Sequence, residues 1–461
     1  MESNVSPGSY LTPGINSTWL SRSGLFAFGF YKQGNGCAVG IFLAGIPQKT
    51  VVWTANRDEP PVSSIATLSF SRDGTLVLQS TPEQTTIIAD SLGSTSAAMP
   101  DTGNFMLYNS DQQMLWQSFE HPTDSLLPGQ RLLVGTEMFS SKSETDHSTG
   151  IFRLKMQHDG HLVQFPVDTP DIPPYAYYES GTPRRGDKVR LNISPDGHLY
   201  LLNATGANIR NLTEGGYPTK ETIYLMRIDA DGIFRLYSHK LKQNGNWSIV
   251  WSSSNDSCDP KGLCGLNGFC ALIDNKAQCV CLPGFEMVQQ GNRTAGCEKS
   301  FDAVGRCSSK DEYYPYTMRE LANTVWEDNS YDVLSFPLKE DCERSCLEDC
   351  NYEAALFKDG ECRKQRPPLR YGRKMLTDSS TAFIKVGKST PANMPKDMPK
   401  ENKEGLRLDI LIISAFFLTF GGMMLVISGI VFYKIIFGIE SSHLMEMLST
   451  TTMLLCDHLL I

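Results

Sequence analysis

The chain has 461 residues, of which 41% are hydrophobic and 20% charged, and its formal net charge is −9. This length allows three or four domains of ordinary size, and the composition is that of a globular protein. The acidic balance argues against a nucleic-acid-binding scaffold, which normally presents a basic face.

The first 250 residues predict short β-strands separated by tight turns. Strand-like runs such as 25–31 and 50–53 alternate in polarity or are rich in β-branched and aromatic residues. Asp-Gly pairs supply the positive φ that a tight hairpin turn needs. Four such pairs begin similar units, at Asp73, Asp159, Asp196 and Asp231. This recurrence predicts a prism or barrel built from repeats, divided into two domains near residues 130–150.

Cysteines dominate the next segment. Six of them lie between residues 258 and 297: Cys258, Cys264, Cys270, Cys279, Cys281 and Cys297. A segment this short and polar cannot bury enough apolar surface to fold alone, so cross-links must add the missing stability. Spacing alone leaves many pairings open. Structural zinc is the alternative, but it usually needs C-x2-C pairs, which this segment lacks. Disulfides are therefore predicted, and with them an extracellular location.

The same part of the chain carries eight Asn-x-Ser/Thr sequons. Their asparagines are Asn4, Asn16, Asn192, Asn203, Asn211, Asn246, Asn255 and Asn292. All of them precede the long apolar segment near the end of the sequence, and together they predict a glycosylated surface. The sequons and the cysteines therefore assign the same region to the secretory side.

A second group of cysteines lies between residues 303 and 387. Cys342, Cys346 and Cys350 are four residues apart, which on a helix would place them on one face. Such a face is expected to attach the helix to a neighbouring sheet. Cys307 and Cys362 flank this run, and the lone Cys37 near the N-terminus is expected to be a buried core residue.

An apolar stretch at 408–433 predicts a transmembrane helix. From Ile410 to Tyr433 it contains no charge, which exceeds the roughly 20 residues that cross a bilayer. A buried core helix is the alternative, but such helices are shorter and carry polar positions. Residues 388–407 predict an extended linker before the span, and 434–461 a short cytoplasmic tail after it.

The orientation of the span is decided by the cysteines and sequons, because the flanking Lys and Arg residues lie mainly on the N-terminal side. The cysteines and sequons predict a single-pass type I protein of the plasma membrane, with its N-terminus outside. No signal-peptide pattern begins the sequence. This orientation therefore leads us to expect either a processed chain or a missing first exon.

Two motifs resemble those of a known family. Residues 52–58 read V-W-T-A-N-R-D, and residues 115–129 read L-W-Q-S-F-E-H-P-T-D-S-L-L-P-G. They resemble the V-W-x-A-N-R-D and W-x-S-F-x-x-P-T-D-T-L-L-P-G signatures of plant G-type (bulb-type) lectin S-receptor-like serine/threonine kinases. The resemblance covers roughly residues 4–434.

The resemblance implies a mainly β protein with one transmembrane helix. The implied order is a bulb-type lectin domain of β-prism repeats at 1–130, a second β-rich S-locus-type domain at 131–253, an EGF-like disulfide module at 254–298 and a PAN-like α+β module at 303–387. EGF-like pairing implies the disulfides Cys258–Cys270, Cys264–Cys279 and Cys281–Cys297.

The PAN-like region departs from the family pattern. The family usually has C-x3-C-x3-C-x-C, but Tyr352 stands where the fourth cysteine is expected. The resemblance then implies a Cys342–Cys362 disulfide and leaves Cys346 without its partner. A Cys307–Cys350 bond remains open.

The carbohydrate motif also departs from the family pattern. Bulb-type lectins bind mannose through Q-x-D-x-N-x-V-x-Y, whose polar side chains bond sugar hydroxyls. In residues 71–79 only Asp73 and Val77 match, and in residues 100–108 only Asn104 and Tyr108. Because each unpaired polar group costs about 1–3 kcal/mol, these sets are expected to bind mannose poorly. Alternatively, Asp73 and Asn104 only shape hairpin turns.

These features predict a membrane-anchored extracellular recognition protein that binds a glycan or protein ligand. No G-x-G-x-x-G, H-R-D or D-F-G motif follows Tyr433, so the chain as given is expected not to be an enzyme. No cofactor, metal or nucleic acid is expected. The EGF-like and PAN-like modules would serve as spacer and dimerisation elements, with a second copy or a related receptor kinase as partner. Two alternatives remain: an incomplete receptor kinase that uses ATP, and a functional mannose-binding lectin.

Overall fold

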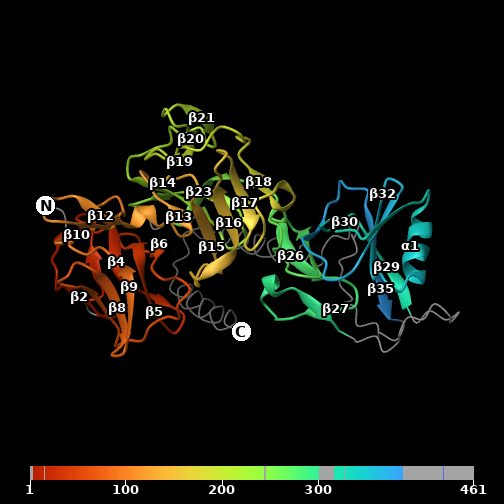
Figure 1. Ribbon diagram of the computed structural model, residues 1–461, viewed down its shortest axis with the longest axis horizontal. Helices are drawn as coiled ribbons and strands as arrows, with labels where there is room; N and C mark the ends of the chain where they lie inside the picture. Colours follow the sequence, from red (N-terminus) through yellow and green to blue (C-terminus); the bar gives the residue numbers. More distant parts are fainter. Residues whose placement is uncertain are drawn as a thin grey trace. The chain divides into compact units, whose positions relative to one another are not determined.

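The computed structural model describes residues 4–14, 16–242, 245–300, 316–327 and 329–387, together with Gly429 (Figure 1). The chain divides into two units, 1–390 and 391–461, and every described residue except Gly429 lies in the first. Within the described residues the fold is mainly β, with one α-helix, α1 (Lys339–Glu348). The short 3-10 helices are η1 (Ser118–Glu120), η2 (Pro173–Tyr175) and η3 (Arg293–Ala295).

Residues 4–117, here called the first prism, form three four-stranded antiparallel sheets. One sheet is β1 (Asn4–Val5), β10 (Ser96–Ala98), β11 (Met106–Tyr108) and β12 (Met114–Gln117). Another is β2 (Tyr10–Leu11), β7 (Thr67–Phe70), β8 (Leu76–Thr81) and β9 (Gln84–Ala89). The third is β3 (Thr18–Leu20), β4 (Phe26–Gln33), β5 (Gly36–Leu43) and β6 (Thr50–Thr54). Their apolar faces share one core, in which the Phe28 and Phe105 rings stack with centroids 4.0 Å apart.

Residues 125–252, here called the second prism, repeat this architecture with another three antiparallel sheets. One sheet is β13 (Ser125–Leu126), β22 (Thr222–Ile228), β23 (Phe234–Lys240) and β24 (Ser248–Ser252). Another is β14 (Arg131–Leu132), β19 (Arg190–Ile193), β20 (Leu199–Leu202) and β21 (Asn208–Asn211). The third is β15 (Glu137–Ser141), β16 (Thr149–Met156), β17 (Leu162–Pro166) and β18 (Tyr178–Glu179).

The first strand of the second prism precedes residue 130. β13, at Ser125–Leu126, pairs with β22, and the domain boundary expected at residue 130 stays a prediction. The strand is only two residues long, too short to show the alternation from which strands are recognised in a sequence.

One turn occurs in every one of the six prism sheets and explains the internal repeat. Gly24, Gly74 and Gly103 in the first prism all have positive φ, and each N–H donates to the carbonyl three residues earlier. Gly160, Gly197 and Gly232 repeat this geometry in the second prism. At Gly74 a Cβ atom would lie 2.4 Å from the backbone nitrogen of Ser94, so this turn has no room for a side chain. Each turn leads into a strand of a different sheet, which builds the two prisms from six equivalent units.

Disulfides hold the segment that follows the second prism. It contains β25 (Gly268–Ile273), β26 (Lys276–Cys281), β27 (Phe285–Met287) and β28 (Cys297–Lys299). Its bonds are Cys258–Cys270, Cys264–Cys279 and Cys281–Cys297, the pairing that the resemblance implies. Cys258, Cys264 and Cys270 are also buried in the core of the second prism, so the disulfides join this segment to it.

Residues 316–387 form a five-stranded sheet covered by α1. Its order is β29 (Tyr316–Ala322), β35 (Thr381–Gly387), β32 (Ala354–Lys358), β33 (Glu361–Gln365) and β31 (Asp332–Ser335). The buried Cys342 and Cys346 lie on the helix, and a disulfide joins Cys342 to Cys362 on β33. The prediction that a cysteine-bearing helix is attached to a sheet thus describes the observed arrangement.

Cys350 does not lie on that helix face. The helix ends at Glu348, and Asp349 has extended backbone angles. The Asp349 carboxylate accepts the N–H of Asn351 at 3.0 Å, and this turn directs the chain away from the helix. Cys350 is disulfide-bonded. Cys307, the partner left open by the sequence, lies outside the described residues.

The disulfide-rich segment and the α1 module share a sheet. Strands β30 (Thr324–Val325) and β34 (Gly372–Lys374) belong to the later module, yet β34 pairs in parallel with β25. The order of this sheet is β26-β25-β34-β30. An ion pair between Arg373 and Asp259, at 2.9 Å, adds to the same contact.

The predicted transmembrane segment at 408–433 lies outside the described residues, apart from Gly429. The linker expected at 388–407 and the tail expected at 434–461 also lie outside them. Among the residues that the structure does describe, no helix has both the length and the apolar character to cross a bilayer.

Candidate carbohydrate-binding positions and the junction of the prisms

Asp73 and Val77 lie on the turn and strand of the β8 unit, where the side chains of the turn bond one another. The Asp73 carboxylate accepts hydrogen bonds from the hydroxyls of Ser71 and Thr75, the latter at 2.9 Å. These bonds, first that from Ser71, hold the pKa of Asp73 below its ordinary value. Val77 is half-buried on β8. Ser71 and Thr75 stand where the motif has Gln and Asn. Their hydroxyls both donate to Oδ1 of Asp73, so this oxygen is already hydrogen-bonded inside the turn.

Asn104 and Tyr108 belong to the β11 unit, where the fold itself uses the amide. Asn104 is 7% exposed, and its Nδ2 donates to Oε1 of Gln117 at 2.7 Å. Its Oδ1 accepts the backbone N–H of Phe119 at 3.1 Å. Tyr108 donates its hydroxyl proton to the sulfur of Met106, 3.1 Å away. The amide thus connects a turn to η1, and a sugar would have to displace these bonds.

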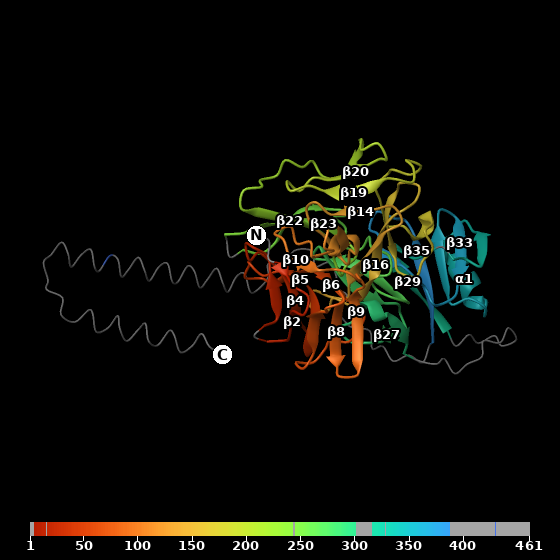
Figure 2. The same cartoon turned by 60° about the vertical axis from the view of Figure 1, so that its left-hand side comes forward.

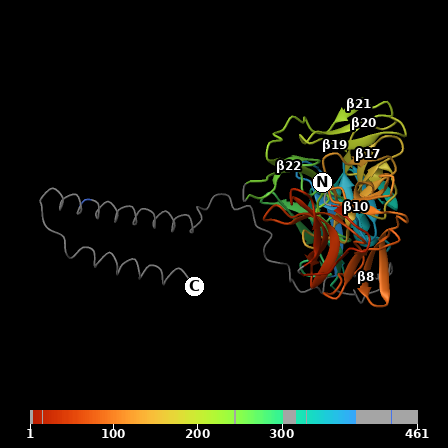
Figure 3. The same cartoon turned by 90° about the vertical axis from the view of Figure 1, so that its left-hand side faces the viewer.

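The two matched pairs do not converge on one site. β8 lies in the β2-β7-β8-β9 sheet and β11 in the β1-β10-β11-β12 sheet, which are separate sheets of the prism (Figure 3). Each unit therefore offers two matched positions of its own, at different places on the surface.

The third unit of the first prism was not recognised from the sequence. Counted from Gly24, its equivalent positions are Ser21, Ser23, Leu25, Ala27 and Gly29. Ser23 donates its backbone N–H to Asp101 of a neighbouring turn at 2.9 Å. Gly24 follows a serine rather than an aspartate, so the Asp-Gly signal is missing. The glycine alone could have marked this turn.

The first family motif lies at the junction of the two prisms. Arg57 is half-buried and donates five hydrogen bonds to residues 139–148, including 2.8 Å to the carbonyl of His147. Asp58 accepts the backbone N–H and the hydroxyl of Thr149, both at 2.8 Å. The Arg57 guanidinium thus satisfies carbonyls of the second prism, the Asp58 carboxylate accepts two of its donors, and both residues connect the two prisms.

The second motif contributes Asp124 to the same junction. Asp124 is 5% exposed and accepts the hydroxyls of Ser125 and Ser141 at 2.8 and 2.7 Å. Burial raises the pKa of its carboxyl, but the charges of Arg227 and Arg57 and the two hydroxyls outweigh burial, so the pKa lies below its ordinary value. Arg227 also donates to the carbonyl of Val51 in the first prism. Asp124 is therefore an ionised group between two arginines.

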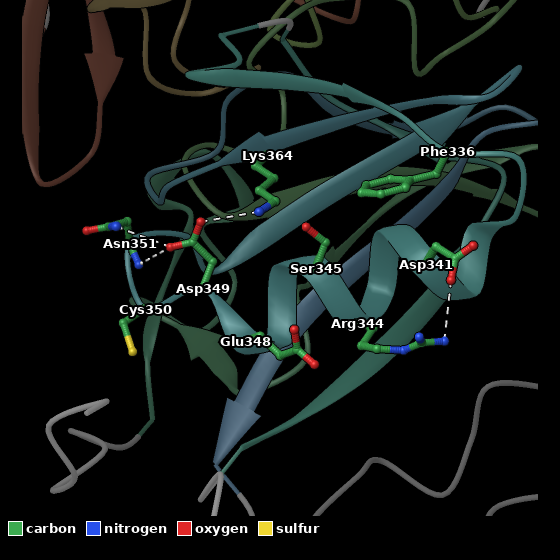
Figure 4. Close-up of a pocket in the computed structure, with 9 residues that line it drawn as sticks. All are labelled: Phe336, Asp341, Arg344, Ser345, Glu348, Asp349, Cys350, Asn351 and Lys364. Atoms are coloured by element: carbon green, nitrogen blue, oxygen red, sulfur yellow. Dashed lines mark hydrogen bonds and ion pairs between the residues drawn. The ribbon is translucent and has the colours of Figure 1, made fainter. Parts of the chain in front are cut away.

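Two hollows lie elsewhere on the described surface. One, of about 850 Å³, lies beside α1 (Figure 4). Four of its charged side chains form ion pairs with one another, Asp341 with Arg344 at 3.3 Å and Asp349 with Lys364 at 3.2 Å. The other, of about 820 Å³, lies between the first prism and residues 144–148. Within the described ranges, no group of three or more His, Cys, Asp or Glu side chains is arranged to hold a metal ion.

Cys37 and Cys346 are the free cysteines of the described residues. Cys346 packs in one apolar cluster with Cys342, against which the ring of Tyr352 also lies. Tyr352, which stands where the resemblance implies a cysteine, thus packs against the cluster that contains the free Cys346. Burial raises the pKa of Cys346 to about 11. Cys37 is half-buried, more open than the core position expected for it.

Thiol labelling should therefore separate the two cysteines. At pH 8 iodoacetamide is expected to modify Cys37 in the folded protein and to leave Cys346 unmodified, because only the thiolate reacts and Cys346 is buried and protonated. Both should react after unfolding in urea, as read by peptide mass mapping. Rapid modification of Cys346 in the folded protein would contradict this placement.

Two family models match the chain. Residues 50–148 match the D-mannose binding lectin model, and residues 210–289 match the S-locus glycoprotein domain model. The first of these spans contains the family motif at 52–58, the β8 and β11 units and the loop that Arg57 contacts.

Curated relatives extend the similarity over most of the chain. The G-type lectin S-receptor-like serine/threonine-protein kinase LECRK3 of Oryza sativa subsp. indica is 30% identical over 84% of this chain and 51% of its own length. LECRK2 of Oryza sativa subsp. japonica is 29% identical over 94% of this chain and 57% of its own length. RLK1 of Arabidopsis thaliana is 29% identical over 87% and 51%. The chain spans about half the length of these relatives.

Among solved structures, a monomeric mannose-binding lectin of Gastrodia elata matches 28% of this chain and 96% of its own, with 18% identity and a TM-score of 0.22. The mannose-specific agglutinin of snowdrop, complexed with methyl-α-D-mannoside, matches 27% of this chain and 94% of its own, with 21% identity and a TM-score of 0.21. The family models and the curated relatives together show that the chain contains regions of the D-mannose binding lectin and S-locus glycoprotein families, and that it is a homologue of the plant G-type lectin S-receptor-like serine/threonine-protein kinases.

Proposed function

We propose that this chain is a membrane-anchored extracellular recognition protein whose two prisms present a surface to a glycan or protein ligand. In this proposal residues 254–298 form an EGF-like module and residues 303–387 a PAN-like module, which act as spacer and dimerisation elements. Residues 408–433 anchor the protein in the plasma membrane. The observation that carries the extracellular location is the disulfides of the described residues, Cys258–Cys270, Cys264–Cys279, Cys281–Cys297 and Cys342–Cys362, because such bonds form and persist in an oxidising compartment.

The ligand surface is proposed to differ from a standard mannose site. The exposed Asp73 and the half-buried Tyr108 each stand among substituted motif positions, and Asn104 is engaged by Gln117 and Phe119. Losing several of the polar partners of one sugar costs about 1–3 kcal/mol for each unpaired group. Mannose therefore fits these positions poorly. The proposed ligand is a protein, or a glycan that is recognised through other residues.

Calorimetry with methyl-α-D-mannoside tests this proposal. The full chain is expected to show no binding up to millimolar sugar. A variant with Pro100→Gln, Thr102→Asp and Met106→Val restores the five motif residues of the β11 unit and is expected to gain binding. Adding Tyr108→Phe to that variant, which removes one hydroxyl, should weaken it again by about tenfold. Submillimolar binding by the unmodified chain would instead support a functional mannose lectin.

The remaining proposals concern the whole protein. The relatives are receptor serine/threonine kinases, and this chain spans about half their length. A related kinase, or a second copy of this chain, is proposed as its membrane partner. Cross-linking on intact cells followed by mass spectrometry would identify either partner. Transcript sequence downstream of residue 461 that encodes H-R-D and D-F-G would favour the alternative of an incomplete receptor kinase.

A further inference from the structure

The outer face of the β14-β19-β20-β21 sheet presents an aromatic pair. Leu199 and Leu201 of β20 are fully buried in the core of the second prism, so the alternating Tyr200 lies on the opposite, outer face. The ring of His198 stacks on Tyr200, with centroids 4.5 Å apart and planes 27° from parallel. Both side chains are half-buried. Figure 2 shows β19 and β20 side by side in this sheet.

Polar groups surround this pair. Nε2 of His198 lies 3.0 Å from Oδ1 of Asn211, which fixes the orientation of the imidazole ring. The Asp196 carboxylate accepts the N–H of Gly216 at 2.8 Å and that of His198 at 3.3 Å. Hydrogen bonds, the largest from Ser194, hold the pKa of Asp196 below its ordinary value. An oriented aromatic surface bordered by a carboxylate and an amide suits a pyranose, which has an apolar C–H face and a rim of hydroxyls.

The equivalent face of the β15-β16-β17-β18 sheet is filled by the chain itself. The Arg153 guanidinium lies over the ring of Phe165, 4.8 Å from its centroid. Arg153 and Lys155 also form four ion pairs with Glu137 and Asp171. The ring of Phe165 on this face is therefore covered by a guanidinium that ion pairs hold in place.

The β13-β22-β23-β24 sheet is covered in a different way. Arg235 pairs with Asp229 and Asp231, and Tyr237 packs against the core of the first prism. Among the three sheets of the second prism, all within the described residues, only the sheet that carries Tyr200 keeps an aromatic pair that neither ion pairs nor the other prism cover.

A sequon lies directly beside the pair. Asn211 is exposed and is the cross-strand partner of Tyr200 in the β20–β21 ladder. Cross-strand neighbours on one face bring their Cβ atoms about 5 Å apart. A sugar attached to Nδ2 of Asn211 would therefore start within reach of the Tyr200 ring. The hydroxyl of Thr213, which completes the sequon, donates to the carbonyl of Gly197 at 2.8 Å, so it also stabilises the turn before His198.

We propose that Tyr200 and His198 form a platform that holds a sugar ring, with Asp196 and Asn211 at its polar border. In both forms of this proposal the bound sugar is an N-acetylglucosamine-type pyranose. It is either the first sugar of an N-glycan on Asn211 of this chain or part of a separate glycan. The first source rests on the proposed extracellular location, and the platform itself does not.

Stability measurements on the full chain, secreted from a eukaryotic host, test the first source. Asn211→Gln and Tyr200→Val are each expected to lower Tm by about 2–4 °C, and the double variant no further, because both remove one contact. Asn255→Gln, at another exposed sequon, and Tyr10→Val, at an exposed tyrosine of β2, should leave Tm unchanged. Peptide mass mapping reports whether Asn211 carries the glycan.

Sugar binding tests the second source. The full chain secreted in the presence of an inhibitor of N-glycosylation keeps Asn211 unmodified and is expected to give a saturation-transfer NMR signal with N,N′-diacetylchitobiose. In the same preparation Tyr200→Val should weaken that binding by about tenfold. Additive Tm changes together with no chitobiose signal would overturn the platform. Recovery of all sequons unmodified and all cysteines reduced would overturn the proposed extracellular function instead, while the chitobiose result would still decide the platform.

Discussion

Replacing Asp124 with alanine is expected to lower the free energy of unfolding by about 3 kcal/mol. The substitution removes the buried carboxylate that lies 4.0 Å from Arg227 and that the charge of Arg57 also stabilises. It also leaves the hydroxyls of Ser125 and Ser141 without their acceptor. Removing one partner of a buried charge cluster costs about 3–5 kcal/mol, and the partial exposure of Arg227 favours the lower value. Urea denaturation of the full chain measures the loss.

The pH dependence of this contribution follows from the sign of the pKa change. The pKa of Asp124 is lower in the folded than in the unfolded protein, so its stabilisation is fully present above the unfolded value of about 3.9. The contribution decreases as the pH falls through the folded pKa. The stability difference between the wild type and Asp124→Ala should therefore be largest at neutral pH and shrink in acid.

Asp111→Ala is the matched control, since Asp111 is exposed in a turn of the first prism. Its effect should stay within about 0.5 kcal/mol. An Asp124→Ala variant as stable as that control would show that the junction does not depend on the buried carboxylate.

Removing the Cys264–Cys279 disulfide, by alanine at both positions, should cost about 3 kcal/mol. The bond closes a loop with a sequence separation of 15, and cross-links of this size stabilise mainly by restricting the unfolded chain. Cys264 is also buried against the second prism, so its loss should loosen that contact and expose the segment to protease. Urea denaturation and limited proteolysis of the full chain provide the measurement.

Cys37→Ala serves as the comparison for the disulfide variant, because Cys37 is half-buried and free. It is expected to unfold within about 1 kcal/mol of the wild type. Equal stability of the disulfide variant and Cys37→Ala would indicate that hydrogen bonding and packing alone hold residues 254–300.

Local signals in the sequence predicted the repeated part of the fold well. Asp-Gly pairs require positive φ, so the turns at Gly74, Gly160, Gly197 and Gly232 were predictable from residue type alone. The hydrophobic alternation after each pair indicated a strand. The turn at Gly24 was not predicted because serine, not aspartate, precedes the glycine. Strand β13 was not predicted because two residues are too few to show a periodicity.

Long-range contacts could not be predicted in this way. The half-buried Arg57 donates hydrogen bonds to carbonyls more than 80 residues away. Because every residue has a backbone carbonyl, the sequence does not reveal which ones accept these bonds. The helix α1 ends before Cys350 because Asp349 forms an Asx turn. The four-residue spacing of the cysteines had indicated a helix that continues to Cys350. The engagement of Asn104 by Gln117 likewise requires the register between a turn and β12. The motif match at Asn104 therefore could not reveal that the fold already uses the amide.

The β25–β34 ladder has a mechanical consequence. Because one sheet takes strands from both the disulfide-rich segment and the α1 module, these parts cannot pivot about a loose hinge without breaking backbone hydrogen bonds. A pull that separates the disulfide-rich segment from the α1 module would have to break that ladder. The described residues of these two parts should therefore transmit force through paired backbone rather than through a flexible linker.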